Sequence, residues 1–275
     1  MNIDKYCVIG NPIAHSKSPE IHPVFAAQTG QQLEYGRCLA PLDGFAQTVR
    51  DLVAQGYQGA NVTVPFKIEA VAVATRLTER ARAAGAVNTL SFMDGEIVGD
   101  NTDGPGLVAD IVRNAGVSLA NQRILLLGAG GAARGIMLPF LNERPRSILV
   151  ANRTVATAEA LVQNFAGHGL KVDAAVAACG FDAIAGRYDV VVNATSSSLA
   201  AEMPPIPGSA FASGTLAVDI MYGSEPSPFM RFAAEHGAAT RDGLGMLVEQ
   251  AAEAFMVWRG VRPDTGEVFN KLRTK

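Results

Sequence analysis

The fold is decided by the stretch RILLLGAGGAA, residues 123–133. Residues 124–127 are all apolar, which is the pattern of a strand buried on both faces in a parallel sheet. Gly128, Gly130 and Ala133 then fit G-x-G-x-x-G/A, and helix-forming sequence follows. The first glycine permits a tight turn, the second lets the backbone approach a pyrophosphate, and the small third residue lets the helix pack closely on the sheet. The stretch therefore predicts a dinucleotide-binding turn at a helix N-terminus, with a purely structural glycine-rich turn as the alternative.

The form of the dinucleotide is indicated by the end of the next predicted strand, residues 147–151. Asn152, Arg153 and Thr154 follow that strand, and no Asp or Glu occurs from 151 to 158. An acid in this place binds the ribose 2′-hydroxyl of NAD, whereas an arginine suits the 2′-phosphate of NADP. The sequence therefore predicts NADP, with Arg153 pairing with the phosphate. The alternative is that Arg153 is only a solvated surface residue.

Strands and helices alternate along most of the chain, which implies a doubly wound sheet around the glycine turn. Met93-Asp94-Gly95 separates two short strands and predicts a hairpin turn. Ser18, followed by Pro19 and Glu20, predicts a helix start with serine at the N-cap. The predicted strands are 5–10, 33–39, 59–64, 89–92, 96–99, 123–127, 147–151, 189–193 and 216–220, and further helices are predicted over 44–55, 67–75, 132–141, 155–165 and 243–260.

The length of 275 residues predicts two domains. The predicted class is α/β, with a substrate-binding α/β domain, a Rossmann-type NADP-binding domain and an active-site cleft between them. A helix starting near 102–106 should carry the chain into the second domain, and the terminal helix should return to the first. The predicted boundaries are 1–104 plus 241–275 for the substrate-binding and catalytic domain, and 105–240 for the Rossmann domain.

The composition is that of a globular enzyme. Hydrophobic residues make up 48%, charged residues 18%, and the formal net charge is −3. This balance lacks the basic excess that nucleic-acid binding needs. The three cysteines are far apart without a CxxC pair, so no metal site is predicted and a reducing compartment is favoured. The sequence contains no apparent signal peptide and no apolar run of membrane-spanning length, so we expect a cytoplasmic protein without a membrane partner.

Polar residues of the first domain gather in three places where strands are expected to end. They are Ser16 with Ser18, the segment 61–67, and Asn88 with 101–103. If the strands are parallel, their carboxyl ends share one edge of the sheet, where ligands bind. Hydroxyls beside a helix N-terminus could hold a carboxylate. Lys67 and Asp103, the charged members of these segments, could form a proton-transfer pair, although each is also compatible with a plain surface or capping role.

With these motifs in place, the chain resembles the shikimate dehydrogenase family over essentially its whole length. Chance agreement is negligible because the matching stretches occur in one order. They are Gly10 to Pro19, Asn61 to Lys67, Gly85 to Thr89, Gly99 to Gly104, Gly128 to Ala133, Asn152 to Thr154, Asn193 to Ser196 and Asp242 to Val248.

The resemblance implies the reversible NADP-linked reduction of 3-dehydroshikimate to shikimate, a step of aromatic amino acid biosynthesis. It implies that Lys67 is the catalytic acid/base and that Asp103 is its partner on the substrate hydroxyls. It implies substrate contacts at Ser16 and Ser18 with the carboxylate, and at Thr63, Asn88, Tyr222 and Gln250. The implied cofactor contacts are Glu79, Gly128, Ala129, Gly130, Gly131, Ala132, Asn152, Arg153, Thr154, Thr195, Ile220 and Gly243.

Two positions depart from the family pattern. Thr157 stands where many members carry a second basic residue, and Ile220 where methionine is frequent. A quinate/shikimate or aminoshikimate-type paralogue therefore stays open, as does a non-catalytic binding protein on the same scaffold. The expected partner is a small-molecule substrate, and the expected assembly is a monomer or a homodimer.

Overall fold

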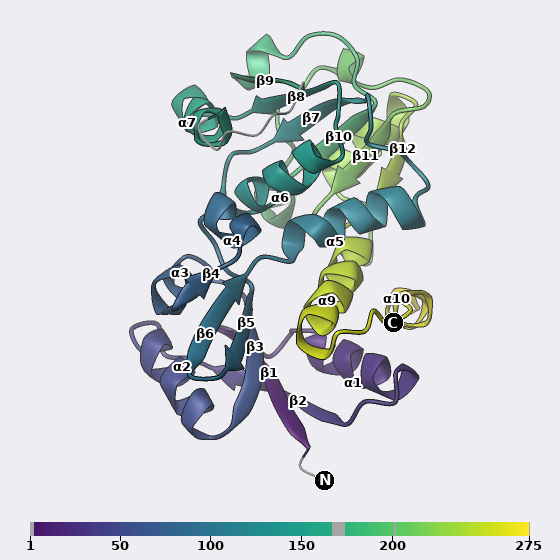
Figure 1. The fold of residues 1–275 in the computed structure, drawn as a ribbon. Coiled ribbons are helices and arrows are strands. Elements are labelled where there is room, and N and C mark those ends of the chain that lie inside the picture. The colour runs from purple at the N-terminus through teal and green to yellow at the C-terminus, as the bar shows by residue number, and fades with distance from the viewer. Residues whose placement is uncertain (1–2, 167–173, 201, 275) are drawn as a thin grey trace. The chain divides into compact units, whose positions relative to one another are not determined.

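The computed structural model describes residues 3–166, 174–200 and 202–274, and the chain divides into two compact units. Unit 1 consists of Met1–Gly106 and Leu247–Lys275, and unit 2 of Leu107–Met246. Each unit contains one six-stranded sheet with helices packed against it (Figure 1). In the described part of the chain, no helix is both long enough and apolar enough to cross a membrane.

The sheet of unit 1 is mixed, with the strand order β2-β1-β3-β5-β6-β4. Strands β2, β1 and β3 are parallel to one another, whereas β5 runs antiparallel to β3, and β6 antiparallel to β5. The strands of the first sheet are therefore not all parallel, which was the assumption under which their carboxyl ends would share one edge. The bounds are β1 (Asp4–Gly10), β2 (Leu33–Leu39), β3 (Tyr57–Val62), β4 (Arg76–Leu77), β5 (Thr89–Met93) and β6 (Glu96–Asp100).

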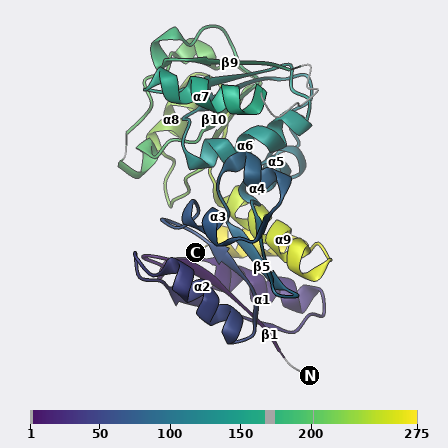
Figure 2. The ribbon, with the colours of Figure 1, turned by 60° about the vertical axis from the view of Figure 1, so that its left-hand side comes forward.

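Helices cover both faces of this sheet (Figure 2). On one face, Phe45 and Val49 of α2 pack with strand residues in a core that also includes Phe66. On the other side, Phe25 of α1 packs against Phe255 of α9, so the end of the chain belongs to the core of unit 1. The helices are α1 (Ser18–Gln28), α2 (Phe45–Ala54), α3 (Glu69–Val73), α4 (Glu79–Ala84), α9 (Leu244–Arg259) and α10 (Gly266–Arg273).

The sheet of unit 2 is parallel throughout, with the order β12-β11-β10-β7-β8-β9. Numbered within the unit this order is 6-5-4-1-2-3, the doubly wound arrangement of dinucleotide-binding domains, so the predicted fold class is confirmed. The strands are β7 (Arg123–Leu127), β8 (Ser147–Ala151), β9 (Ala175–Cys179), β10 (Val190–Asn193), β11 (Leu216–Asp219) and β12 (Ala239–Arg241). The helices are α6 (Gly131–Asn142), α7 (Val155–Ala166) and α8 (Pro228–Glu235), and α5 (Asp103–Ala109) runs across the boundary at Gly106.

Two local predictions were wrong in detail. Ser18 is the first residue of α1, and Lys17 occupies the N-cap position. The hydroxyl of Ser16 accepts the N–H of Ser18 at 3.4 Å, so a residue further upstream performs the capping. The third strand ends at Val62, because Thr63 accepts a turn hydrogen bond from the N–H of Phe66.

Candidate functional site

The two predicted proton-transfer residues are in contact. Lys67 Nζ lies 2.7 Å from Asp103 Oδ2, with the lysine side chain 32% exposed and the carboxylate 13% exposed. Lys67 lies in the turn after β3, and Asp103 begins α5 after a two-residue connection from β6. Between these strands lies the antiparallel β5, so the end of β3, the start of β5 and the end of β6 meet at one edge of the sheet. The ion pair is accessible to a ligand and fixed by the sheet.

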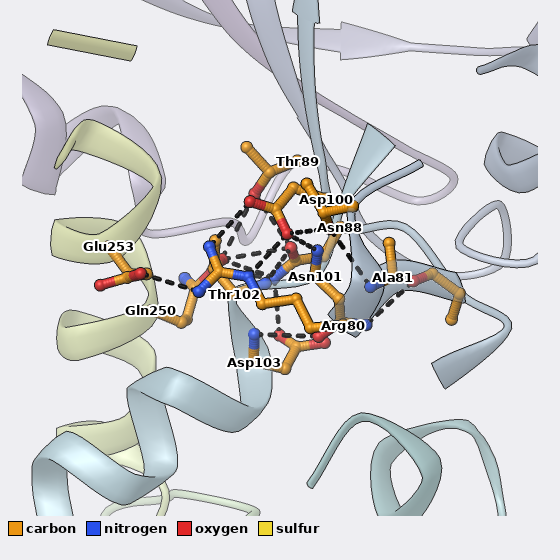
Figure 3. Close-up of polar contacts among 12 residues, drawn as sticks. Arg80, Ala81, Asn88, Thr89, Asp100, Asn101, Thr102, Asp103, Gln250 and Glu253 are labelled. Atoms are coloured by element: carbon orange, nitrogen blue, oxygen red, sulfur yellow. Dashed lines mark hydrogen bonds and ion pairs between the residues drawn. The ribbon is translucent and has the colours of Figure 1, made fainter. Parts of the chain in front are cut away.

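Asn88, immediately before β5, holds the other oxygen of Asp103. Its Nδ2 donates to Asp103 Oδ1 at 2.9 Å and to Gln250 Oε1 of α9 at 3.3 Å (Figure 3). Its Oδ1 accepts from the Thr102 N–H at 2.8 Å and from the Thr89 hydroxyl at 2.9 Å. These donors fix the orientation of the amide, since the amide oxygen must face them. Both oxygens of Asp103 are therefore held, one by Lys67 and one by Asn88.

Ser16 and Ser18 lie together at the start of α1. The Ser16 hydroxyl donates to the Ser18 hydroxyl at 3.3 Å, and Arg37 of β2 donates to the Ser16 carbonyl at 2.7 Å. Ser18 is buried. Two hydroxyls at a helix N-terminus form a group of donors suited to an anionic substituent such as a carboxylate.

The sequence did not indicate the roles of Tyr35 and Asn61 behind this site, although Asn61 belongs to the polar segment 61–67. The Tyr35 hydroxyl donates to Asn61 Oδ1 at 2.6 Å, and Asn61 Nδ2 donates to the Asn88 carbonyl and the Thr89 hydroxyl, both at 3.2 Å. Burial raises the pKa of Tyr35 well above its ordinary value, so the phenol stays neutral and can donate. A half-buried tyrosine on a strand gives no local signal for this contact, because its partner lies 26 residues away.

Thr63 also lies at this end of unit 1, where its methyl group packs against Gly10. A Cβ on Gly10 would collide with that methyl group, so the glycine allows β1 and the turn after β3 to approach closely. Glu79 is the first residue of α4 in unit 1.

In unit 2 the glycine turn has the geometry that its sequence predicts. Gly128 has φ +100°, and a Cβ there would lie 3.1 Å from the carbonyl oxygen of Ala194, so the position requires glycine. Gly130 is the N-cap residue of α6, and around Gly130 and Gly131 a Cβ would meet no described atom within 4 Å. Ala133, in the first turn of α6, is fully buried. The turn therefore leaves open backbone at a helix N-terminus, which fits a pyrophosphate.

Asn152, Arg153 and Thr154 follow β8, beside this turn in the sheet order. Asn152 Nδ2 donates to the Thr154 carbonyl at 2.9 Å, and the Asn152 N–H donates to the Cys179 carbonyl of β9. The segment is thus a closed turn, and Arg153 is exposed on it. A guanidinium in this place can reach a ribose phosphate.

The loops after β10 and β11 are joined through the buried carboxylate of Asp219. It accepts from the hydroxyls of Ser198 and Ser227 at 2.6 Å each, and Asn193 Oδ1 accepts from the Thr195 hydroxyl at 2.7 Å. Thr195 packs next to Gly128, so this network supports the glycine turn.

Ile220 and Gly243 lie against each other in unit 2. A Cβ on Gly243 would overlap the Ile220 carbonyl, and the Gly243 N–H donates to the Met221 carbonyl at 2.9 Å. Tyr222, two residues beyond Ile220, is 47% exposed, and burial of part of its side chain raises its pKa. Within the described ranges there is no group of three or more His, Cys, Asp or Glu that could hold a metal ion.

Models of known families match three parts of the chain. Residues 8–90 match the shikimate dehydrogenase substrate binding domain, 110–203 match shikimate / quinate 5-dehydrogenase, and 243–268 match the shikimate 5′-dehydrogenase C-terminal domain.

Relatives cover almost the whole chain. A protein of Janthinobacterium sp. (strain Marseille) named shikimate dehydrogenase (NADP(+)) is 61% identical over 99% of this chain and 98% of its own. The crystal structure of an Ael1 enzyme from Pseudomonas putida is similar with a TM-score of 0.92 and 48% identity, covering 98% of each chain. Shikimate 5-dehydrogenase from Thermus thermophilus, in complex with NADP(H) and shikimate, has a TM-score of 0.86 and 30% identity, covering 99% of each chain.

Proposed function

This chain belongs to the shikimate dehydrogenase family and is an NADP-dependent oxidoreductase of aromatic amino acid biosynthesis, and we propose that it reduces 3-dehydroshikimate reversibly to shikimate with Lys67 as the acid/base and Asp103 as its partner. The contact between Lys67 Nζ and Asp103 Oδ2 at 2.7 Å supports these roles most directly. A lysine in this setting has a fixed direction for its remaining N–H groups, which is what proton transfer to one oxygen requires.

When bound, NADPH supplies the hydride that adds to the C3 carbonyl carbon. The ammonium of Lys67 gives one proton to the oxygen that becomes the C3 hydroxyl, and in the oxidation direction the neutral amine takes that proton back. Asp103 holds Lys67 through Oδ2, and its remaining lone pairs accept from substrate hydroxyls. Asn88 keeps the carboxylate in place through Oδ1.

The rest of the substrate is bound by polar groups of matching chemistry. Ser16 and Ser18 donate to the ring carboxylate, and Thr63 and Gln250 contact the hydroxyl groups, together with Tyr222. A small polyhydroxy acid needs many hydrogen bonds in a small volume, because polar groups left unpaired on either side weaken binding.

The cofactor is held by the remaining residues. The turn from Gly128 to Ala132 would hold the pyrophosphate, with the open backbone at Gly130 and Gly131 nearest to it. Arg153, flanked by Asn152 and Thr154, would pair with the 2′-phosphate. Glu79, Thr195, Ile220 and Gly243 make further contacts with NADP.

The deciding experiment is a steady-state panel of shikimate and quinate, each with NADP and NAD. We expect shikimate with NADP to give the highest kcat/KM. Equal or higher efficiency with quinate would contradict the proposed substrate and favour a quinate/shikimate-type paralogue. No turnover with any pair of substrate and cofactor, together with measurable binding of shikimate, would favour a non-catalytic protein.

The proposal extends to the partner, the compartment and the assembly of this enzyme. Its partner is a small molecule, it works in the cytoplasm, and it is a monomer or a homodimer. Light scattering of the purified chain distinguishes the two assemblies, and a larger particle would contradict both.

A further inference from the structure

Two segments that carry proposed substrate contacts are far apart in sequence and close together in unit 1. The segment that ends at Asp103 leaves β6, and Gln250 lies on α9 near the end of the chain. Figure 3 shows one side chain reaching both: Arg80 of α4 forms ion pairs with Asp100, three residues before Asp103, and with Glu253, one helical turn after Gln250.

On the β6 side, the contact is a planar fork. Arg80 Nε donates to Asp100 Oδ1 at 2.6 Å, and Arg80 Nη2 donates to Asp100 Oδ2 at 2.7 Å. The same carboxylate accepts from the Thr78 hydroxyl at 2.6 Å and the Asn101 N–H at 2.7 Å. Burial alone would raise the pKa of Asp100, but hydrogen bonds and the charge of Arg80 lower it overall, so the carboxylate stays charged. The fork thus fixes the direction of the backbone leading to Asp103.

On the α9 side, the contact continues into a second arginine. Arg80 Nη1 donates to Glu253 Oε1 at 2.9 Å, and Arg262 Nη1 donates to Glu253 Oε2 at 2.8 Å. Arg262 also donates to Glu249 at 2.6 Å. Glu249 and Glu253 flank Gln250 on the helix, so the two arginines hold the turn that presents it.

We propose that Arg80 is a positioning residue for the substrate, because it sets the place of Asp103 relative to Gln250. Asn88 Nδ2 donates to both of these residues, so a displacement of either one disturbs the same amide. The inference rests on the proposed roles of Asp103 and Gln250. Arg80 itself contacts only Asp100 and Glu253 among the ion-pair partners in the described ranges.

A purely stabilising role is a poorer explanation for this arrangement. Partly buried ion pairs lose hydration, and apolar replacements of similar volume are often as stable or more stable. A planar guanidinium that binds one carboxylate through two nitrogens and a second carboxylate through the third defines a direction that a lysine cannot reproduce.

The test is Arg80→Lys, which keeps the charge and loses the fork. The matched control is Arg76→Lys, whose pair with Glu96 in the same unit is exposed, at 59% and 52%. We expect Arg80→Lys to raise the shikimate KM about tenfold and to change the NADP KM less than about twofold, because small displacements of binding groups are costly. The control should change both constants less than about twofold.

A fall in melting temperature and in apparent kcat, with an unchanged shikimate KM, would overturn the proposal, because loss of folded enzyme does not change KM. If Arg80→Lys fails to fold, Glu253→Gln removes the charge on the α9 side and leaves the Asp100 fork intact. That variant should also raise the shikimate KM selectively, and an unchanged KM would again overturn the proposal. A failure of the proposed function is distinguishable, since the unmodified enzyme would then not turn over shikimate with NADP.

Discussion

The two units build their proposed sites from different parts of the chain. In unit 1 the site is a network of side chains, in which Lys67, Asp103 and Asn88 hold one another at 2.7 to 2.9 Å. In unit 2 the centre of the site is backbone, exposed at Gly130 and Gly131 because no side chain stands there. Substitutions in unit 1 should therefore reduce activity when they remove a polar side chain. Substitutions in unit 2 should reduce it when they add a side chain to the open backbone.

The largest effect is expected from Lys67→Met in unit 1. Loss of the acid/base should lower kcat by about 10³-fold, since general acid–base catalysis contributes factors of this order. The shikimate KM should change far less, because other groups bind the substrate. Steady-state kinetics at saturating NADP measure both constants, with Lys271→Met on the exposed side of α10 as the control. A near-normal kcat would remove Lys67 from the mechanism.

A second test concerns Arg153, the basic side chain among the proposed cofactor contacts of unit 2. Arg153→Ala should lower kcat/KM for NADP by about 30-fold, since a charge-assisted bidentate contact contributes roughly 1.5 to 3 kcal/mol. The value for NAD should stay nearly constant, because NAD has no 2′-phosphate. Arg146→Ala, just before β8 rather than just after it, is the matched control. Parallel losses with both cofactors would show that Arg153 does not read the phosphate.

A third test asks whether the open backbone of unit 2 is functional. Gly130→Ala adds a methyl group that meets no described atom, so the protein should fold normally. The added group should raise the NADP KM by about tenfold, because it occupies the approach to the pyrophosphate. Gly36→Ala, equally uncrowded on β2 of unit 1, should leave the NADP KM unchanged. An unaltered NADP KM in Gly130→Ala would place the cofactor away from this turn.

The same contrast explains what could be predicted from the sequence. The glycine turn is local: its strand, its left-handed Gly128 and its helix lie within a few residues, so spacing alone indicates its geometry. The pairing of Lys67 with Asp103 spans 36 residues and depends on β5 running antiparallel between β3 and β6. The placement of polar segments at strand ends suggested the pair but left a surface or capping role open for each residue, and the family resemblance gave the pair its catalytic role.

The features that the sequence did not predict depend on contacts between distant residues or on short elements. The hairpin around Asp94 and Gly95 was foreseen from its turn residues, both of which have positive φ. Its pairing with β3 was not, because strand order depends on packing of the whole unit. Arg80 and Tyr35 escaped notice for the same reason, since their partners lie up to 173 residues away. Helices α4, α8 and α10 and strands β4, β9 and β12 were not predicted because their apolar patterns are short.

The smallest effect is expected in the pH dependence of stability. It comes from a buried histidine in unit 1, whereas the histidine compared with it in unit 2 is exposed. His22 of α1 is fully buried in unit 1 and stacks on Tyr35, with ring centroids 4.1 Å apart. Burial lowers the pKa of His22 from 6.5 to about 3, although the side chain of Asn61 favours the charged form. The unfolded chain therefore binds a proton that the folded chain refuses between these two pH values.

The contribution of neutral His22 to stability should consequently be fully present above pH 6.5. The free energy of unfolding should fall as the pH decreases toward 3, by at most about 1.4 kcal/mol per pH unit. Urea unfolding at pH 7.5, 6.0 and 5.0 measures the slope. His22→Phe should flatten it, because the ring can still stack on Tyr35 but no longer binds a proton. His236→Gln in unit 2, where the histidine is exposed, should keep the slope of the unmodified protein. If His22→Phe retained the full slope, the acid sensitivity would have to come from carboxylates, and the buried histidine would not distinguish unit 1 from unit 2.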